Sequence, residues 1–366
     1  MVHAYTAASI FTGSAYLAGH AILVKEGSIT ALVPLAKLPG DVALTDYGNG
    51  LIVPAFFDNQ VYGAGGLLFA VHPTIEALKK LYAHCASGGA HHFMPTVATN
   101  PYPVFYQCID AVRAYQQAGG KGCMGLHIEG PWINEVRRGA HIASLIHSPT
   151  VEQARELLEY GKGIIKMITL APEVCSREVI DLVQSYGIIV AAGHSNATFA
   201  QATAAFDDGI KTATHLFNTM SPLQHRAPGM VGAIMHHPTA MCSIIPDGYH
   251  VDFEVIAIAK KVMGERLYMI TDAVTDTTQG PYPHQLEGDK YVSNGILSGS
   301  AITIIQGVKN CIEKVGIEPA EALRMASLYP AQVINLDHQF GRIAPGYKAA
   351  LLVLDEGYNI TAHVSA

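Results

Sequence analysis

The middle of the chain alternates short apolar runs, typical of buried strands, with segments whose apolar residues recur at the spacing of a helix face. The strand-like runs are Phe93–Thr99, Cys123–Glu129, Ile164–Leu170, Ile188–Gly193, Thr212–His215, Met241–Pro246 and Leu267–Asp272. The helical segments are Thr74–Ala86, Val104–Gln117, Thr150–Tyr160, Ser176–Tyr186, Thr198–Phe206, Phe253–Met263 and Ala320–Ala326. About seven strand–helix units in roughly 270 residues predict an α/β fold, a (β/α)8 barrel of the TIM type. A doubly wound sheet fits less well because no Gly-x-Gly-x-x-Gly follows the first strand.

Both ends of the chain differ from this middle. Residues 1–55 contain short strand-like runs separated by turns at Gly13, Gly27 and Gly40, and a matching run, Ala350–Asp355, follows the turn-rich segment 341–348. Two β-rich ends around an alternating middle predict a small, discontinuous β-sandwich domain. We expect it to comprise residues 1–55 and 335–366, with the barrel formed by residues 56–334.

Composition excludes several classes of protein. The 366 residues carry a net charge of −7 and no run of basic residues, so we expect no nucleic-acid partner. No apolar run approaches the roughly 18 residues that span a bilayer, so we expect no membrane segment. The six cysteines are scattered without a C-x-x-C pair, and most fall in apolar patterns. Buried free thiols suggest a reducing compartment, so we expect a cytoplasmic protein.

Four of the predicted strands end in a side chain that can bind a metal or move a proton. These side chains are Glu129, His194, His215 and Asp272, and Gly130-Pro131 stops the first strand directly after Glu129. In a barrel of this type, catalytic groups lie at the carboxyl ends of the strands. Catalytic zinc-type sites commonly use three protein ligands and leave one position for water. One Glu and two His supply that set, and Asp272 could remain off the metal as general base and acid. Any single one of the 18 histidines is more simply explained as a hydrogen-bonded or surface residue, but the repeated placement at strand ends predicts a metal-dependent hydrolase.

Six segments, in one order along nearly the whole chain, resemble the motif series of the N-acetylglucosamine-6-phosphate deacetylase family of the amidohydrolase superfamily. They are His127-Ile128-Glu129-Gly130-Pro131, Ala192-Gly193-His194-Ser195-Asn196-Ala197, Thr214-His215-Leu216-Phe217-Asn218-Thr219-Met220, Asp247-Gly248-Tyr249-His250-Val251-Asp252, Thr271-Asp272-Ala273 and Leu297-Ser298-Gly299-Ser300. The resemblance implies removal of the N-acetyl group of N-acetylglucosamine-6-phosphate, which gives glucosamine-6-phosphate and acetate. It also implies a homodimer, because phosphate sites in this family borrow residues from the neighbouring subunit.

The resemblance also assigns roles to residues. Glu129, His194 and His215 would bind one divalent ion per subunit, with zinc expected first and iron, manganese or cobalt as alternatives. Asp272 would be the acid/base, and His141 would contact the sugar and polarise the acetyl carbonyl. The positions that would contact the substrate are Gln60, Asn218, Thr219, Arg226 and His250. Arg226 suits a phosphate because a guanidinium can grip it through two parallel hydrogen bonds.

One stretch departs from the wider superfamily. Amidohydrolases often carry His-x-His after the first barrel strand for a second metal, whereas the matching stretch here runs from Asp58 to Gly63 and has Gln60 and Tyr62 instead. Neither is a good ligand for a zinc-type ion, so we expect one metal. Tyr62 is bulkier than the residue usual at its place, and we expect its ring to pack against the barrel floor rather than contact a ligand.

Two alternatives stay open on the sequence. A deacetylase for a related sugar, such as N-acetylgalactosamine-6-phosphate, would need nearly the same residues. A non-catalytic barrel that only binds ligands would be compatible with the missing His-x-His, although the presence of all four strand-end groups argues against it.

Overall fold

The computed structural model describes residues 1–365, and eight parallel strands form its central sheet. The order of the strands in this sheet follows the chain, so that each strand lies beside the next one in sequence, from the first to the eighth. The strands are β8 (Phe56–Val61), β11 (Ala90–Ala98), β12 (Leu126–Glu129), β13 (Ile165–Leu170), β14 (Ile189–Ala192), β15 (Thr212–Ala213), β16 (Met241–Ile244) and β17 (Leu267–Met269). The predicted (β/α)8 barrel is confirmed.

The barrel closes between its first and last strands. The amide of Asp272 donates to the carbonyl of Gln60 at 3.0 Å, and the amide of Tyr62 donates to the carbonyl of Ala273 at 2.9 Å. The first strand, Phe56–Val61, was not among the predicted strands. The stretch from Asp58 to Gly63, which we expected after the first strand, begins inside this strand. Its middle reads Asp58-Asn59-Gln60, which lacks the apolar alternation of a strand because these side chains are buried in the barrel.

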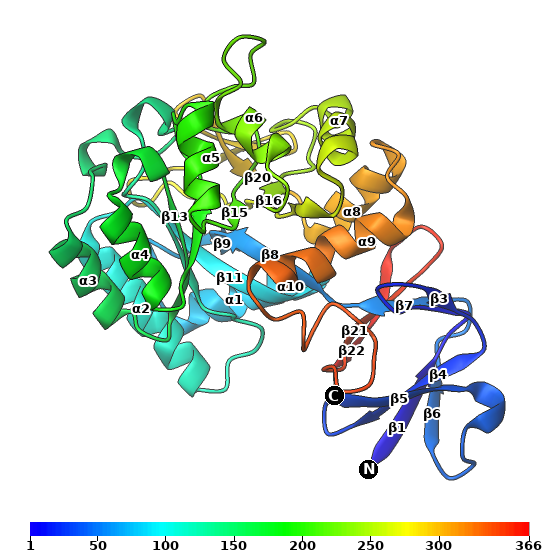
Figure 1. Ribbon diagram of the computed structural model, residues 1–366. Helices are drawn as coiled ribbons and strands as arrows, with labels where there is room; N and C mark the ends of the chain where they lie inside the picture. The colour runs from blue at the N-terminus through cyan, green and yellow to red at the C-terminus, as the bar shows by residue number, and fades with distance from the viewer. Residues whose placement is uncertain (366) are drawn as a thin grey trace.

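Helices cover the outside of the sheet (Figure 1). They are α1 (Ile75–Ser87), α2 (Tyr102–Gln117), α3 (Val151–Tyr160), α4 (Arg177–Ser185), α5 (Phe199–Asp207), α6 (Gly229–His236), α7 (Phe253–Met263), α8 (Ile304–Glu313), α9 (Pro319–Ala326) and α10 (Leu328–Val333). Several begin where a side chain caps the free amides of the first turn. Thr150 and Thr198 each form a capping box with a glutamine three residues later, which fixes where α3 and α5 start. The prediction missed α6, α8 and α10.

Two further sheets are formed by the ends of the chain: one contains N-terminal strands only, and the other combines strands from both ends. One has the order β5 (Ser28–Pro34), β4 (His20–Lys25), β1 (Val2–Thr6), β6 (Ala43–Asp46). The other has the order β22 (Ile360–Ser365), β21 (Ala350–Leu354), β7 (Leu51–Pro54), β2 (Ser9–Phe11), β3 (Tyr16–Leu17). Both termini lie at this part of the molecule, away from the barrel helices (Figure 1).

Residues from the two ends share a core of their own, in which Ile10 and Ile22 from the N-terminal part pack with Leu351, Val353 and Val364. The β-sandwich formed from both termini is therefore confirmed, while the boundaries at residues 55 and 335 stay predictions.

Two small sheets lie along the chain next to the barrel's carboxyl end. A hairpin of β9 (Gly63–Ala64) and β10 (Leu67–Leu68) follows the first strand. A three-stranded antiparallel sheet of β18 (Gln285–Glu287), β19 (Lys290–Ser293) and β20 (Ile296–Ser300) follows the last one, and Ser300 pairs with Ala273. Within the described residues, no helix has both the length and the apolar character needed to cross a bilayer.

Candidate active site

The strand-end side chains of the barrel converge on the carboxylate of Glu129, the last residue of β12. His194, His215 and Asp272 each follow a strand closely, and each has a left-handed backbone, with φ of 47°, 37° and 55°. Left-handed φ is uncommon outside glycine, but histidine and aspartate adopt it more readily than most residues. The chain thus turns sharply at each strand end and leaves a polar side chain at the rim.

One oxygen of the Glu129 carboxylate forms a nearly equilateral triangle with two imidazole nitrogens. Oε1 lies 3.2 Å from Nε2 of His194 and 3.1 Å from Nε2 of His215, and the two nitrogens are 3.2 Å apart. Ligand atoms about 2.0 Å from a tetrahedral ion are roughly 3.3 Å from each other. The spacing of these three atoms therefore fits a divalent ion of the zinc type, with a fourth position free.

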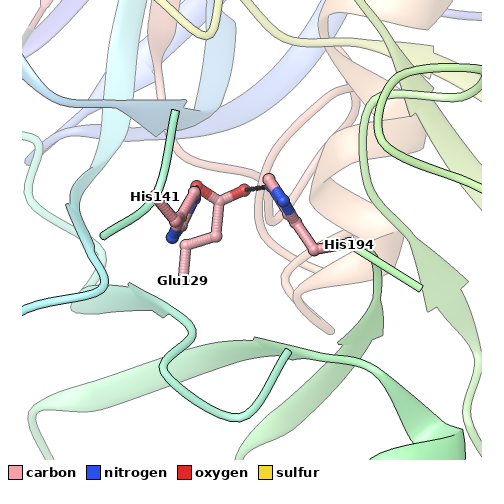
Figure 2. A group of neighbouring side chains, drawn as sticks. All are labelled: Glu129, His141 and His194. Carbon is pink, nitrogen blue, oxygen red and sulfur yellow. Dashed lines mark hydrogen bonds and ion pairs between the residues drawn. The ribbon is translucent and has the colours of Figure 1, made fainter. Parts of the chain in front are cut away.

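A third imidazole, that of His141, faces the other oxygen of Glu129. Its Nε2 lies 3.2 Å from Oε2, and the group Glu129, His141 and His194 has ligand atoms that all lie within 4.8 Å of one another. Figure 2 shows the carboxylate between the two rings, with the contact to His194 marked. Distance alone would thus allow His141 to serve as a ligand in place of His215.

Hydrogen bonds on the far side of each ring distinguish the two histidines that Figure 2 shows beside Glu129. The backbone amide of Thr99 donates to Nδ1 of His141 at 3.3 Å, so in the neutral ring the proton is on Nε2. Nδ1 of His194 faces the carbonyl of Arg137 at 3.0 Å, which can only accept, so its Nε2 has a free lone pair. His194 is therefore prepared to bind a metal, whereas His141 is prepared to donate a hydrogen bond, which in this structure goes to Oε2 of Glu129.

Asp272 and Gln60 complete the polar group across the seam of the barrel. Nε2 of Gln60 lies 2.8 Å from Oδ1 of Asp272 and 2.9 Å from Oε1 of Glu129, while its Oε1 accepts from Thr214 at 2.5 Å. Since the carboxylates can only accept, the amide of Gln60 is oriented with its NH2 group between two acids. A neutral donor therefore occupies the space between the two carboxylates.

Burial and neighbouring groups shift the acidities of the site. Burial raises the pKa of Asp272 to about 6, although the charge of His215 acts in the opposite direction. Burial would also raise the pKa of Glu129, but the facing histidines, His194 foremost, hold that pKa well below its usual range. Burial lowers the pKa of His194 to about 4, which keeps its ring in the neutral form that binds metals. A carboxyl with a pKa near 6 is suited to exchange protons near neutral pH.

A cavity opens above this group. Its lining includes Asn218, Thr219 and His250, as the sequence predicted for substrate contacts, and Nδ1 of His250 is fixed at 2.6 Å from Oδ2 of Asp247. Arg226 is exposed and does not line the cavity of its own chain. Within residues 1–365, the lining contains neither lysine nor arginine.

Some cavity residues were not expected. The ring of Tyr62 packs in an apolar cluster, but the prediction did not include its place in the cavity lining or its hydroxyl, which is 2.5 Å from Oε2 of Glu129. Period-two alternation from Gln60 could have revealed it, since side chains two apart share a strand face. Tyr282 and His284 also line the cavity, from the segment between β17 and β18. We find no sequence signal for these two, because they follow no strand and sit in no recognisable pattern.

Comparison with known proteins agrees with this architecture. The profile of the amidohydrolase family matches residues 51–366, and that of the NagA composite domain matches residues 2–50. The chain belongs to the amidohydrolase family. Amidohydrolases of this family are metal-dependent, and the Glu/His group described above could hold the ion.

Individual amidohydrolase relatives are similar over nearly their whole length. The N-acetylglucosamine-6-phosphate deacetylase of Haemophilus influenzae is 33% identical over 97% of this chain and 96% of its own. The N-acetylgalactosamine-6-phosphate deacetylase of Escherichia coli O157:H7 is 30% identical over 98% of this chain and 97% of its own. The crystal structure of N-acetylglucosamine-6-phosphate deacetylase from Pasteurella multocida superposes with a TM-score of 0.94 at 32% identity, covering 100% of this chain and 98% of that one.

Proposed function

We propose that this chain is an N-acetylglucosamine-6-phosphate deacetylase, which hydrolyses the substrate to glucosamine-6-phosphate and acetate. One observation carries the proposal: the triangle of Glu129 Oε1 and the Nε2 atoms of His194 and His215 lies beside a proton-exchanging carboxyl at the floor of a cavity. The names of the full-length relatives support the choice of an acetylated amino sugar phosphate as the substrate.

The proposed ligands of the ion are Glu129, His194 and His215, one ion per chain, with zinc first among the candidates. The set of one carboxylate oxygen and two neutral imidazoles suits zinc, and iron, manganese or cobalt bind similar sets. When bound, such an ion would polarise the acyl oxygen of the substrate and the attacking water.

The chain's own groups would then move the protons and hold the substrate. Asp272 takes a proton from the water as its oxygen attacks the acetyl carbon, and returns it to the amide nitrogen as the C–N bond breaks. His141 lines the cavity, and its Nε2 proton, which faces Oε2 of Glu129 in the free protein, would shift to the oxyanion that forms on the acyl oxygen. Asn218, Thr219 and His250 line the cavity and are the proposed contacts to the sugar, from the loops after β15 and β16. Gln60, the other predicted contact, does not line the cavity, and its amide lies against Glu129 and Asp272.

The phosphate requires a cation that the cavity of a single chain does not supply within residues 1–365. The segment between β15 and α6 projects beyond the barrel helices, and it carries Arg226 in exposed surroundings (Figure 1). We therefore propose a homodimer in which Arg226 of one subunit reaches the phosphate in the cavity of its partner. A cytoplasmic location is proposed on the six buried cysteines, which form no disulfide in the part of the chain that the structure describes.

The test is release of free amine from N-acetylglucosamine-6-phosphate by purified protein, first stripped of metal with a chelator and then supplied with Zn2+. We expect no turnover without metal and recovery with it. The galacto epimer at equal concentration serves as the comparison substrate, and a higher kcat/KM for it would reassign the sugar. Absence of turnover on both epimers with every divalent ion tested would refute a deacetylase.

A further inference from the structure

The hydroxyl of Tyr62 holds the one oxygen of Glu129 that does not face the two proposed histidine ligands. Its oxygen is 2.5 Å from Oε2 of Glu129 and 2.8 Å from Nε2 of Gln60. Because a carboxylate oxygen only accepts, the phenol donates its proton to Glu129. Nε2 of Gln60 has two protons for three acceptors, which are the Tyr62 hydroxyl, Glu129 and Asp272, so only the direction of the Tyr62–Glu129 hydrogen bond is fixed.

The ring of Tyr62 is held in place by its own apolar cluster. Tyr62 is 9% exposed and packs with Leu68, Val274 and Tyr282, separately from the main core of the barrel. These neighbours come from the β9–β10 hairpin, which follows the first barrel strand, and from the segment after β17, the last barrel strand. The ring is therefore packed by residues from both strands at which the barrel closes. A hydroxyl on a fixed ring can orient its partner, because it loses little conformational freedom on binding.

Together, Tyr62 and Gln60 divide the two oxygens of Glu129 between different tasks. Oε2 is occupied by the Tyr62 hydroxyl and the Nε2 proton of His141, so Oε1 is the oxygen that faces His194 and His215. A carboxylate held in this way offers a metal one oxygen instead of two. The amide of Gln60 lies between Glu129 and Asp272, within hydrogen-bond distance of both carboxylates.

We propose that Tyr62 is a positioning residue for the metal site: its hydroxyl holds Glu129 as a one-oxygen ligand, and Tyr62 and Gln60 together offer a second ion no suitable ligands. The inference rests on the proposed ligand set of the metal. Hydrogen bonds to a metal ligand commonly contribute about 10- to 100-fold in metal affinity when they are lost by mutation. Tyr62 acts on the ion through Glu129 and needs no contact with the substrate.

The test compares Tyr62→Phe with Tyr282→Phe, a matched pair that removes one hydroxyl each from the same apolar cluster. The hydroxyl of Tyr282 donates to the carbonyl of Thr99 at 2.5 Å and does not contact Glu129. Zn2+ affinity is measured by competition with a chelator, and thermal unfolding of the metal-stripped variants reports on packing. We expect Tyr62→Phe to weaken Zn2+ binding by about tenfold or more. Tyr282→Phe should keep the wild-type affinity, and both stripped variants should melt as the parent does or with similar small losses.

Equal Zn2+ affinity in the two variants would overturn the positioning role. Stoichiometry tests the exclusion of a second ion: the wild type should bind one Zn2+ per chain, and the double variant Gln60→His with Tyr62→His should bind two. A wild type that binds two ions, or a double variant that binds one, would overturn that part. These measurements need no substrate, so a protein that binds Zn2+ as expected but releases no amine would refute the deacetylase while leaving the role of Tyr62 intact.

Discussion

Buried histidines gather at both ends of the barrel, and their surroundings differ. At the amino end of β11, His91 pairs with His363 at 2.9 Å between ring nitrogens, and His92 packs against the rings of both Phe57 and Phe340. Neither nitrogen of His92 has a hydrogen-bond partner among residues 1–365. Burial lowers the pKa of His91 to about 4 and that of His92 to about 3.

At the carboxyl end, three imidazoles point their Nε2 atoms at one carboxylate, that of Glu129. Burial would lower the pKa of His215, but the hydrogen bond to Glu129 and the charges of Glu129 and Asp272 together outweigh burial and raise the pKa. Both groups are buried to a similar extent, so burial alone does not distinguish a metal site from packing. The difference is that the ring nitrogens converge on one shared carboxylate, and this depends on how each strand ends.

The largest effect is expected at the carboxyl end, from Asp272→Asn. The amide cannot take a proton from water, so kcat should fall by roughly 10²- to 10⁴-fold while Zn2+ affinity persists. In the wild type, the carboxyl is protonated below its pKa of about 6, and a bound cation lowers that pKa further. The acidic limb of the kcat/KM profile should therefore lie at or below pH 6 and be absent in the variant. Full activity in Asp272→Asn would remove this residue from the mechanism.

A smaller effect should come from Arg226→Ala, which leaves both histidine groups unchanged. Loss of a charge-assisted hydrogen bond of about 1.5–3 kcal/mol should raise KM for the phosphorylated sugar roughly 10- to 100-fold. The matched measurement uses N-acetylglucosamine without phosphate, on which the variant and the parent should be equally slow. Chains with an inactivated catalytic site can also be mixed with Arg226→Ala chains. If the arginine acts across subunits, the mixture should recover part of the activity. An unchanged KM would exclude Arg226 from phosphate binding.

The smallest effect is expected at the amino end, from His92→Leu. Leucine is of similar size and removes a buried polar ring without partners, so the free energy of unfolding should rise by about 1–3 kcal/mol with kcat/KM unchanged. An unfolded histidine takes up a proton below about pH 6.5, whereas the pKa of buried His92 is about 3. The parent therefore loses stability as pH falls from 6.5, and the gain from the variant should be larger at pH 5 than at pH 7 in urea unfolding. A destabilised variant would mean that His92 has a structural partner.

The fold could be predicted where the local pattern agrees with the final environment. The seven predicted strands and the capped helices lie where expected because each has one apolar face and a clear start or stop. The first strand was missed because its buried side chains, Asp58, Asn59 and Gln60, are polar: Asp58 and Gln60 bond to groups in or just after other barrel strands, and Asn59 donates to a carbonyl of helix α10. Helix α6 begins at Gly229 after a proline, which sequence patterns associate with loops.

Site residues at strand ends could be anticipated for the same reason, since parallel strands bring their carboxyl ends to one rim. The tautomers could not, because they depend on a backbone amide of Thr99 and a carbonyl of Arg137 that are far apart in the sequence from the rings they contact. The role of Tyr62 also depends on a distant residue, Glu129, which lies 67 positions along the chain.

The left-handed backbone at His194, His215 and Asp272 has an evolutionary consequence. A residue held in that region costs of order 1 kcal/mol or more, and the surrounding structure must supply the difference. Glycine or asparagine at these positions would relax the main chain while abolishing the proposed chemistry. Substitutions that stabilise the barrel should therefore be enriched at the residues on which activity depends. A lineage released from selection for activity should lose these three site residues early.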